Sequence, residues 1–128
     1  MADTAFPVLV VDDYNTMVRI MRKLLKQIGY DDVDDAASGA EALGKIKAKT
    51  YGLIISDWNM EPMTGLDLLK AVRAAPETAN TPFLLVTAES KADNVLAARN
   101  AGANDYLIKP FSAPALKEKI EKALTVKV

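Results

Sequence analysis

Side chains able to do chemistry stand at the ends of four apolar runs in this sequence. These side chains are Asp12 and Asp13, Asp57, Thr87 and Lys109. Apolar runs without polar alternation, such as 53–55, predict strands that are buried on both faces. In an open parallel sheet the carboxyl ends of the strands share one edge, where ligands bind. We therefore expect the five side chains to meet at that edge.

Such a group of side chains suits a phosphoryl group and a hard cation. Three carboxylates held close together repel one another, and a bound divalent cation relieves the repulsion. Carboxylate and water ligands favour Mg²⁺, which often completes its shell with phosphate oxygens. Lys109 adds a cation and Thr87 a hydroxyl donor, so that Asp57 is placed to attack a phosphoryl group.

Each residue also has a purely structural interpretation. Asp12 and Asp13 could be turn residues that favour the dipole of the next helix. Thr87 could bond to backbone, and Lys109 before proline could be a turn. Trp58 could serve packing or a partner contact. The gathering of several polar strand ends at one edge favours the functional interpretation over these single placements.

Strands and helices are predicted to alternate five times along the chain. Apolar residues at helical spacing follow Asn15, and Gly29 supplies a stop. Further helix starts are predicted at the capping patterns 38–41, 64–67 and 90–93 and at Pro114. The polar segment 31–37 predicts at most an edge strand. This alternation predicts an α/β fold, with helices wrapped around a parallel sheet.

Composition narrows the chemistry further. At 128 residues the chain is expected to be one domain, without a separate output domain. It has no cysteine and no histidine, which excludes thiol nucleophiles, disulfides, Ser-His triads and imidazole metal ligands. The 16 basic and 17 acidic residues give a net charge of -1, which argues against a nucleic-acid partner. No signal peptide or membrane span is predicted, so we expect a cytoplasmic protein.

Four segments resemble the receiver domains of two-component response regulators. They are 10–13 (VVDD), 56–60 (SDWNM), 86–89 (VTAE) and 106–111 (YLIKPF). The resemblance covers essentially the whole chain and is greatest to the single-domain regulators of chemotaxis. It implies one receiver domain over 1–128 with a doubly wound, flavodoxin-like sheet of strand order 2-1-3-4-5.

The resemblance assigns roles to the strand-end residues. Asp57 would accept a phosphoryl group from the phosphohistidine of a partner histidine kinase. Lys109 would pair with the phosphoryl oxygens, Thr87 would donate to one of them, and Tyr106 would turn inward behind it. The implied Mg²⁺ site consists of Asp13, Asp57, the carbonyl of Asn59 and, through water, Asp12. The chain would act as a phosphoryl acceptor and not as a substrate-turnover enzyme.

The resemblance also implies an output face on the fourth helix, last strand and last helix. Its residues include Lys91, Val95, Tyr106 and Lys119. Phosphorylation would switch this face toward an output partner, with the flagellar motor switch protein as the leading expectation and a phosphatase as a further one. The chain itself is expected to be a monomer without a membrane partner.

Three local features refine this expectation. Asn59 and Glu89 stand two residues past the phosphoacceptor and the threonine, as in fast-signalling chemotaxis regulators, and imply a short-lived phosphoryl state. The resemblance implies a cis bond before Pro110. Glu61 departs from the family, which usually has proline there, and adds a negative charge beside the acidic edge.

Three alternatives stay open. The chain could be a phosphate sink or phosphorelay shuttle that never contacts a motor. It could be an aspartyl-phosphate phosphatase, although such enzymes usually carry a second Asp where this chain has Asn59. The chain could also be a flavodoxin-like cofactor binder, which shares the architecture. The first loop of such a protein must bind phosphate, whereas Asp12 and Asp13 would repel phosphate unless a metal is bound.

Overall fold

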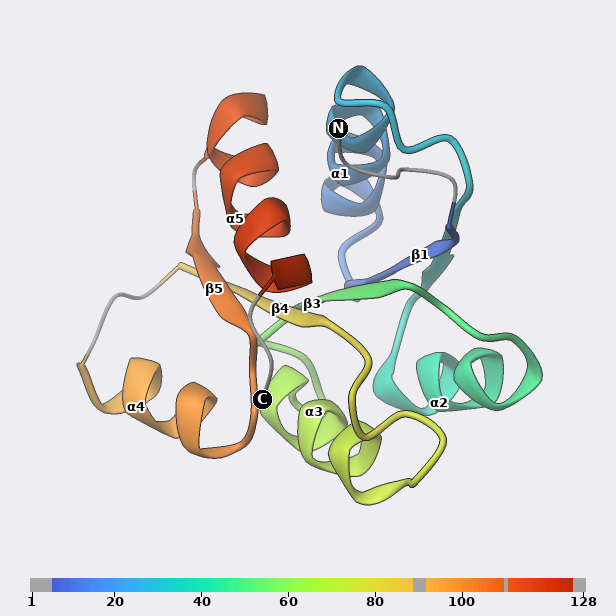
Figure 1. Ribbon diagram of the computed structural model, residues 1–128, viewed down its shortest axis with the longest axis vertical. Helices are drawn as coiled ribbons and strands as arrows, with labels where there is room; N and C mark the ends of the chain where they lie inside the picture. Colours follow the sequence, from blue (N-terminus) through green and yellow to red (C-terminus); the bar gives the residue numbers. More distant parts are fainter. Residues whose placement is uncertain (1–5, 89–91, 110, 126–128) are drawn as a thin grey trace.

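The computed structural model describes residues 6–88, 92–109 and 111–125, and shows five strands alternating with five helices (Figure 1). The strands are β1 (Val8–Val11), β2 (Val33–Ala36), β3 (Leu53–Asp57), β4 (Phe83–Thr87) and β5 (Asp105–Ile108). The helices are α1 (Asn15–Gln27), α2 (Gly39–Ala48), α3 (Gly65–Ala74), α4 (Ala92–Asn100) and α5 (Ala113–Thr125). None of these helices is long and apolar enough to cross a membrane.

The strands form one parallel sheet in the order β2-β1-β3-β4-β5, which confirms the predicted fold. The central strand β3 pairs with β1 on one side and β4 on the other, and every residue of these three strands is buried. The polar strand β2 lies at an edge, as its sequence predicts. Because all strands are parallel, their carboxyl ends share one edge of the sheet.

Two hydrophobic cores cover the two faces of the sheet. Helices α1 and α5 lie on one face, and α2, α3 and α4 lie on the other (Figure 1). Neighbouring residues on a strand point to opposite faces, so Ile54 joins the core beneath α2 and α3 whereas Leu53 and Ile55 join the core beneath α1 and α5. The continuous apolar runs are therefore explained by burial on both faces.

Helix starts agree with the capping patterns in part. At α3, Thr64 and Asp67 form the complete reciprocal capping box. At α2, the Ser38 hydroxyl accepts from the Glu41 amide, but the Glu41 carboxylate accepts from the amide of residue 37 instead of that of Ser38. The pattern at 90–93 lies partly outside the described residues.

The last helix begins one residue earlier than predicted. Its first residue is Ala113, and the Ser112 hydroxyl accepts a hydrogen bond from the Ala115 amide at 3.3 Å. Pro114 therefore occupies the second helical position, where the amide hydrogen that proline lacks has no partner within the helix. Gly29 and Gly102 adopt positive φ values of 105° and 96° just beyond α1 and α4, which explains physically why α1 stops at Gly29 as predicted.

Candidate functional site

Asp57 is held at the carboxyl end of β3 by pairing on both sides. On the β1 side Val11 is the partner of Ser56, so the chain leaves the sheet at Asp12 beside Asp57. On the β4 side Asp57 is opposite Val86, and the ladder continues because the Trp58 amide donates to the Val86 carbonyl at 2.8 Å. Asp57 is 7% exposed, so a rigid backbone presents a nearly buried carboxylate at the sheet edge.

Three carboxylates gather at this edge. One oxygen from each of Asp12, Asp13 and Asp57 lies within 4.8 Å of the others. Asp12 and Asp57 are buried, whereas Asp13 is exposed, so the cluster opens toward solvent on the Asp13 side. An all-oxygen set of this kind suits a hard divalent cation such as Mg²⁺ or Ca²⁺. The chemistry and spacing of the donors therefore fit a metal ion.

Lys109 brings one positive charge to the three carboxylates. Its Nζ lies 3.0 Å from Asp57 Oδ1 and 3.8 Å from Asp12 Oδ2. The Lys109 amide donates to the Thr87 carbonyl at 2.8 Å, which extends the pairing of β5 with β4 and fixes where this side chain starts. A net excess of negative charge remains, which a divalent cation would relieve.

Burial and charge act together on Asp12. Desolvation raises the pKa of this carboxyl above its ordinary value, and the neighbouring negative charges of Asp57 and Asp13 raise it further. The hydrogen bond from the Tyr14 amide to Asp12 Oδ1, 2.9 Å long, and the positive charge of Lys109 oppose that rise in pKa. Asp12 is thus a carboxylate whose charged form needs compensation from a cation.

Thr87 and Tyr106 lie on adjacent strands beside the acidic cluster. Thr87 is buried at the end of β4, one residue beyond the partner of Asp57. Tyr106 is half-buried on β5, and both residues line a narrow gap together with Trp58, Val95 and two further residues of α4, Asn94 and Ala98. Thr87, predicted to bind the phosphoryl group, and Tyr106, predicted as a switch residue, therefore line the same gap.

The remaining predicted site residues are placed in different ways. Asn59 is exposed immediately after Trp58, and Val95 is partly exposed on α4. Lys119 of α5 lies 3.4 Å from Asp105 Oδ1 and 5.3 Å from the centre of the Tyr106 ring. Three predicted features, Glu89, Lys91 and the bond before Pro110, lie outside the described residues. Glu61 is exposed, and its bond to Pro62 is cis.

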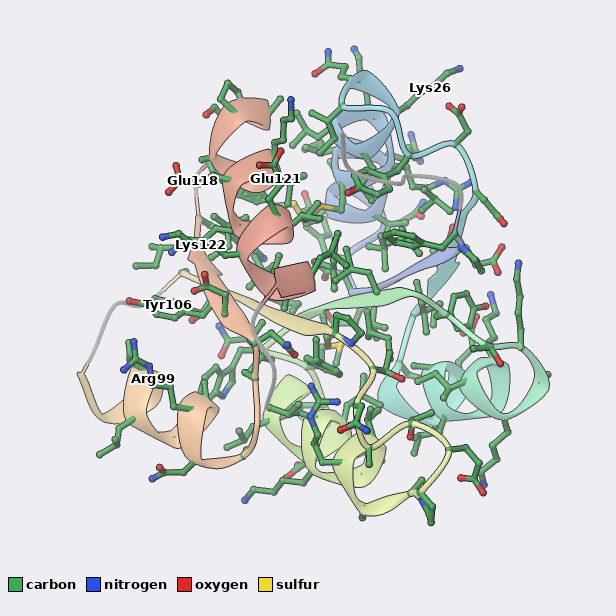
Figure 2. All side chains as sticks on the ribbon, viewed as in Figure 1. Lys26, Arg99, Tyr106, Glu118, Glu121 and Lys122 are labelled. Atoms are coloured by element: carbon green, nitrogen blue, oxygen red, sulfur yellow. The ribbon has the colours of Figure 1, made fainter. Side chains whose placement is uncertain are left out.

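The predicted output face forms one side of the molecule. In Figure 2 the labelled side chains of Arg99 on α4, Tyr106 on β5, and Glu118 and Lys122 on α5 lie along the same side. Glu118 and Lys122 form an ion pair of 3.6 Å with both side chains more than half exposed. This side presents an aromatic ring among charges of both signs.

Sequence reasoning missed three residues that shape this region. Gly65, the first residue of α3, packs so closely that a Cβ there would lie 2.2 Å from the Asp57 carbonyl oxygen. The buried Ser56 hydroxyl donates to the same carbonyl at 3.0 Å. Asp105 pairs with Lys119 beside Tyr106. For Gly65, a glycine directly after a capping threonine was the sequence signal that could have indicated close packing. The contacts of Ser56 and Asp105 depend on tertiary packing and have no such signal.

Comparison with known proteins identifies the class. The response regulator receiver domain family matches residues 8–121, and the chain belongs to that family. Among solved structures, a putative response regulator from Chloroflexus aurantiacus superposes with a TM-score of 0.88 at 36% identity, over 94% of this chain and 98% of that one. Chemotaxis protein CheY4 of Vibrio cholerae gives a TM-score of 0.86 at 36% identity, over 92% of this chain and 98% of that one.

Within the family, the chain is similar to chemotaxis regulators. It is 46% identical to the chemotaxis protein CheY of Pseudomonas aeruginosa over 115 residues, which cover 90% of this chain and 93% of that protein. It is 43% identical to chemotaxis protein CheY-3 of Vibrio cholerae, over 90% of this chain and 88% of that protein. The chain is therefore a CheY-like receiver domain.

Proposed function

We propose that this receiver accepts a phosphoryl group on Asp57 from the phosphohistidine of a partner histidine kinase. The observation that carries the proposal is the geometry at the sheet edge. A nearly buried Asp57 carboxylate lies 3.0 Å from the Lys109 ammonium and shares a cluster with Asp12 and Asp13. The sequence has no histidine, so the phosphohistidine must be supplied by another protein.

In the transfer, an Asp57 carboxylate oxygen forms a bond to phosphorus while the bond from phosphorus to the donor imidazole nitrogen breaks. The electron pair stays on the imidazole, which takes up a proton from solvent. Lys109 would exchange its contact with Asp57 for the phosphoryl oxygens, and the Thr87 hydroxyl would donate to one of them. The protein contributes positioning and charge neutralisation, which dominate phosphoryl transfer.

Asp13, Asp57 and the Asn59 carbonyl, with Asp12 acting through water, would hold Mg²⁺. The fit rests on the cluster of carboxylate oxygens and on the need of Asp12 for a compensating cation. When bound, Mg²⁺ neutralises negative charge on the transferred group. Glu61 places a further acid on the exposed loop after Asn59 and is a candidate for tuning cation affinity.

Phosphorylation would act by shifting the population of conformations of the output face. This face includes Lys91, Val95, Tyr106 and Lys119. Thr87 and Tyr106 line the same gap, so a Thr87 side chain drawn toward a phosphoryl group leaves room for the Tyr106 ring to turn inward. We propose the flagellar motor switch as the output partner, because the similar proteins are named for chemotaxis. The protein would act as a cytoplasmic monomer, with a phosphatase as a further partner.

A second candidate function is a phosphate sink or phosphorelay shuttle. The exposed Glu61, where the family usually has proline, favours a different set of partners. Binding of a motor-switch peptide to the protein with and without beryllofluoride, a phosphoryl mimic, separates the two roles. Tighter binding in the presence of the mimic supports motor output, and equal binding supports the sink. An aspartyl-phosphate phosphatase is disfavoured because Asn59 cannot act as its general acid.

The site itself is tested by intact mass after incubation with acetyl phosphate. We expect an adduct of one phosphoryl group that requires Mg²⁺ and is absent in Asp57→Asn. The matched control is Asp67→Asn, which changes an exposed carboxylate at the start of α3 without touching the cluster. An adduct that forms in both Asp57→Asn and Asp67→Asn would place the phosphoryl group on another residue.

The lifetime of the phosphoryl group is a separate expectation. Asn59 and Glu89 imply a short-lived acyl phosphate, so label should leave the isolated phosphoprotein within seconds to minutes. A lifetime of hours would contradict this assignment while leaving Asp57 as the acceptor. Sustained turnover of free phosphoesters would instead support an enzyme.

A further inference from the structure

The edge strand β2 turns two backbone carbonyls away from the sheet. Its inward groups pair with β1, since the Val8 amide donates to the Asp32 carbonyl at 2.9 Å and the Asp12 amide to the Ala36 carbonyl at 3.1 Å. Alternate residues of a strand direct their backbone groups to opposite sides. The carbonyl and amide groups of Val33 and Asp35 therefore point outward, to the free edge where a further strand could pair.

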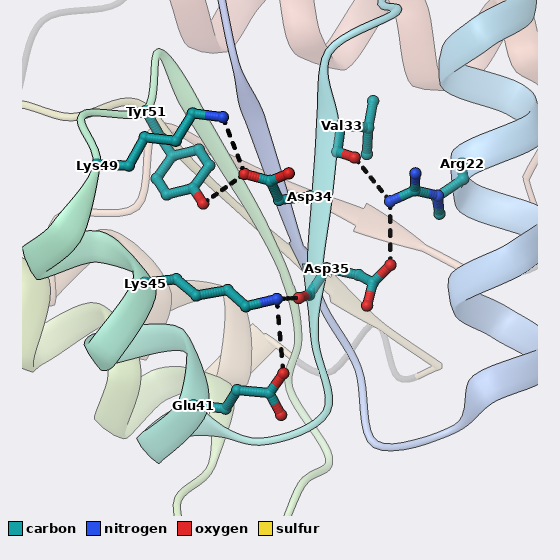
Figure 3. Close-up of polar contacts among 8 residues, drawn as sticks. All are labelled: Arg22, Val33, Asp34, Asp35, Glu41, Lys45, Lys49 and Tyr51. Atoms are coloured by element: carbon teal, nitrogen blue, oxygen red, sulfur yellow. Dashed lines mark hydrogen bonds and ion pairs between the residues drawn. The ribbon is translucent and has the colours of Figure 1, made fainter.

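Both outward carbonyls are occupied by long cationic side chains. Arg22 reaches from α1, and its Nη1 donates to the Val33 carbonyl at 2.7 Å and to Asp35 Oδ2 at 3.0 Å (Figure 3). Lys45 reaches from α2 on the other face of the sheet, and its Nζ donates to the Asp35 carbonyl. The two acceptors that a further strand would need are thus taken from opposite sides.

The positions of these two cations are supported by acidic neighbours. Arg22 is held by its ion pair with Asp35, and Lys45 lies 3.6 Å from Glu41 Oε1 one helical turn away. The side chains of these two ion pairs are 39% to 47% exposed, so solvent reaches the contacts. Displacing them would require a competitor that offers backbone amides in register.

We propose that Arg22 and Lys45 close the β2 edge against strand addition by a second copy of this chain. The partner is a second copy of the chain because the outward edge of β2 is complementary to itself. If two β2 strands pair in antiparallel fashion about a two-fold axis at Asp34, Val33 of one copy is opposite Asp35 of the other. Such a pair exchanges both backbone hydrogen bonds. The same patch then serves both partners, as a two-fold interface requires.

Asp34 adds a second barrier to the same pairing. On the axis it would lie opposite its own copy, and like charges directly opposite each other destabilise paired strands. Its carboxylate accepts from the Tyr51 hydroxyl at 2.7 Å and from Lys49 Nζ at 3.1 Å, which neutralises this charge in part. Arg22 and Lys45 make no hydrogen bond or ion pair with the Asp34 carboxylate, but the positive charge of Lys45 helps to lower the pKa of Asp34. The Asp34→Asn background therefore serves to separate the effect of the caps from that of the charge.

The test compares the oligomeric state of proteins with and without the caps. The variant Arg22→Ala with Lys45→Ala is made in the wild-type background and in an Asp34→Asn background, and mass is followed by sedimentation equilibrium up to millimolar concentration. We expect the apparent mass to rise toward twice that of the monomer in at least one uncapped protein. The counterparts that keep Arg22 and Lys45 should stay monomeric, including Asp34→Asn alone.

A matched control removes the same charge from the same two helices. Arg19 of α1 and Lys47 of α2 are exposed and make no ion pair among the described side chains. The double variant Arg19→Ala with Lys47→Ala should therefore remain a monomer. Dimerisation of this control to the same extent would overturn the proposal, because the effect would then come from net charge.

Hydrogen exchange locates the interface. In the uncapped dimer, the amides of Val33 and Asp35 should gain protection relative to the wild-type monomer. Uncapped proteins that fold and remain monomeric in both backgrounds would overturn the proposal, as would a dimer without this protection. Should the alanine variants fail to fold, Arg22→Met with Lys45→Met keeps the side-chain stems while removing the donors, and the same outcomes apply.

Discussion

Replacing Gly65 by alanine is expected to damage both stability and the site. An added Cβ would lie 2.2 Å from the Asp57 carbonyl oxygen, 2.9 Å from the Asp57 carbonyl carbon and 2.9 Å from Trp58 Cα. These are backbone atoms of the strand end, so no flexible side chain can move aside. Either α3 or the segment that carries Asp57 must shift.

The magnitude follows from two opposing effects. Forcing extra volume into a packed region costs about 1–3 kcal/mol. Alanine in place of glycine gains at most about 1 kcal/mol of helix propensity. Gly65 does not have positive φ, so alanine meets no strain from the backbone conformation itself. Because the contacts are well inside van der Waals distance, we expect a net loss of about 2 kcal/mol in unfolding free energy.

Urea denaturation measures this loss, and Gly44→Ala is the matched control. Gly44 lies within α2, and apart from its own stretch of helix no atom lies within 4 Å of an added Cβ, so alanine there should stabilise by about 0.5–1 kcal/mol. Phosphoryl uptake from acetyl phosphate should slow in folded Gly65→Ala and stay unchanged in Gly44→Ala. If Gly65→Ala and wild type were equally stable and took up the phosphoryl group equally fast, the claim that α3 packs too closely on Asp57 to admit a Cβ would be refuted.

Three further perturbations test other parts of the structure. Arg73→Met should lower the unfolding free energy by about 3 kcal/mol, because the guanidinium donates at 2.6 to 3.4 Å to four acceptors in the α3–β4 loop, at Gly102 and at Asn104. The Thr78 carbonyl and Asn104 Oδ1 keep amide donors in the variant, from Thr81 and Phe83, whereas the carbonyls of Thr81 and Gly102 lose the Arg73 donor. A loss below about 1 kcal/mol in urea denaturation would contradict this. The hydrogen bond from the Tyr51 hydroxyl lowers the pKa of Asp34. At pH values above the ordinary carboxyl pKa of about 3.9, Asp34→Asn should therefore lower the unfolding free energy by about 1 kcal/mol, and this difference from wild type should fade as the pH falls below that value. A difference that grows in acid would be inconsistent with a lowered pKa. Asp13→Asn should weaken Mn²⁺ binding at least about tenfold in a fluorescence titration of the single tryptophan, Trp58, and unchanged affinity would remove Asp13 from the metal site.

Much of the fold is readable from the sequence because the strands are buried on both faces. The runs ending at Asp57 and Thr87 appear as continuous apolar segments, and their parallel arrangement follows from the alternation with helices. Strand β2 is harder to predict because its apolar content is small. Its edge position explains this, since an edge strand needs less apolar surface and tolerates charge.

The gathering of Asp12, Asp13, Asp57, Thr87 and Lys109 at one edge was also predictable, since topology alone brings parallel strand ends together. Helix starts were predictable at Thr64, where the capping pattern is local, and at Asn15, where apolar residues at helical spacing begin without a side-chain cap. At α5 the start moved to Ala113, because the neighbouring Ser112 supplies the cap.

The sequence by itself determined the order of elements, the identity of the strand-end residues and the absence of imidazole and thiol chemistry. Only the tertiary structure decided which atoms meet. The 3.0 Å contact from Lys109 to Asp57 spans 52 residues, and the two cations that close the β2 edge come from different helices on opposite faces of the sheet. Local patterns report which residues are buried or capped within a few positions, whereas contacts between distant segments depend on how the helices settle on the sheet.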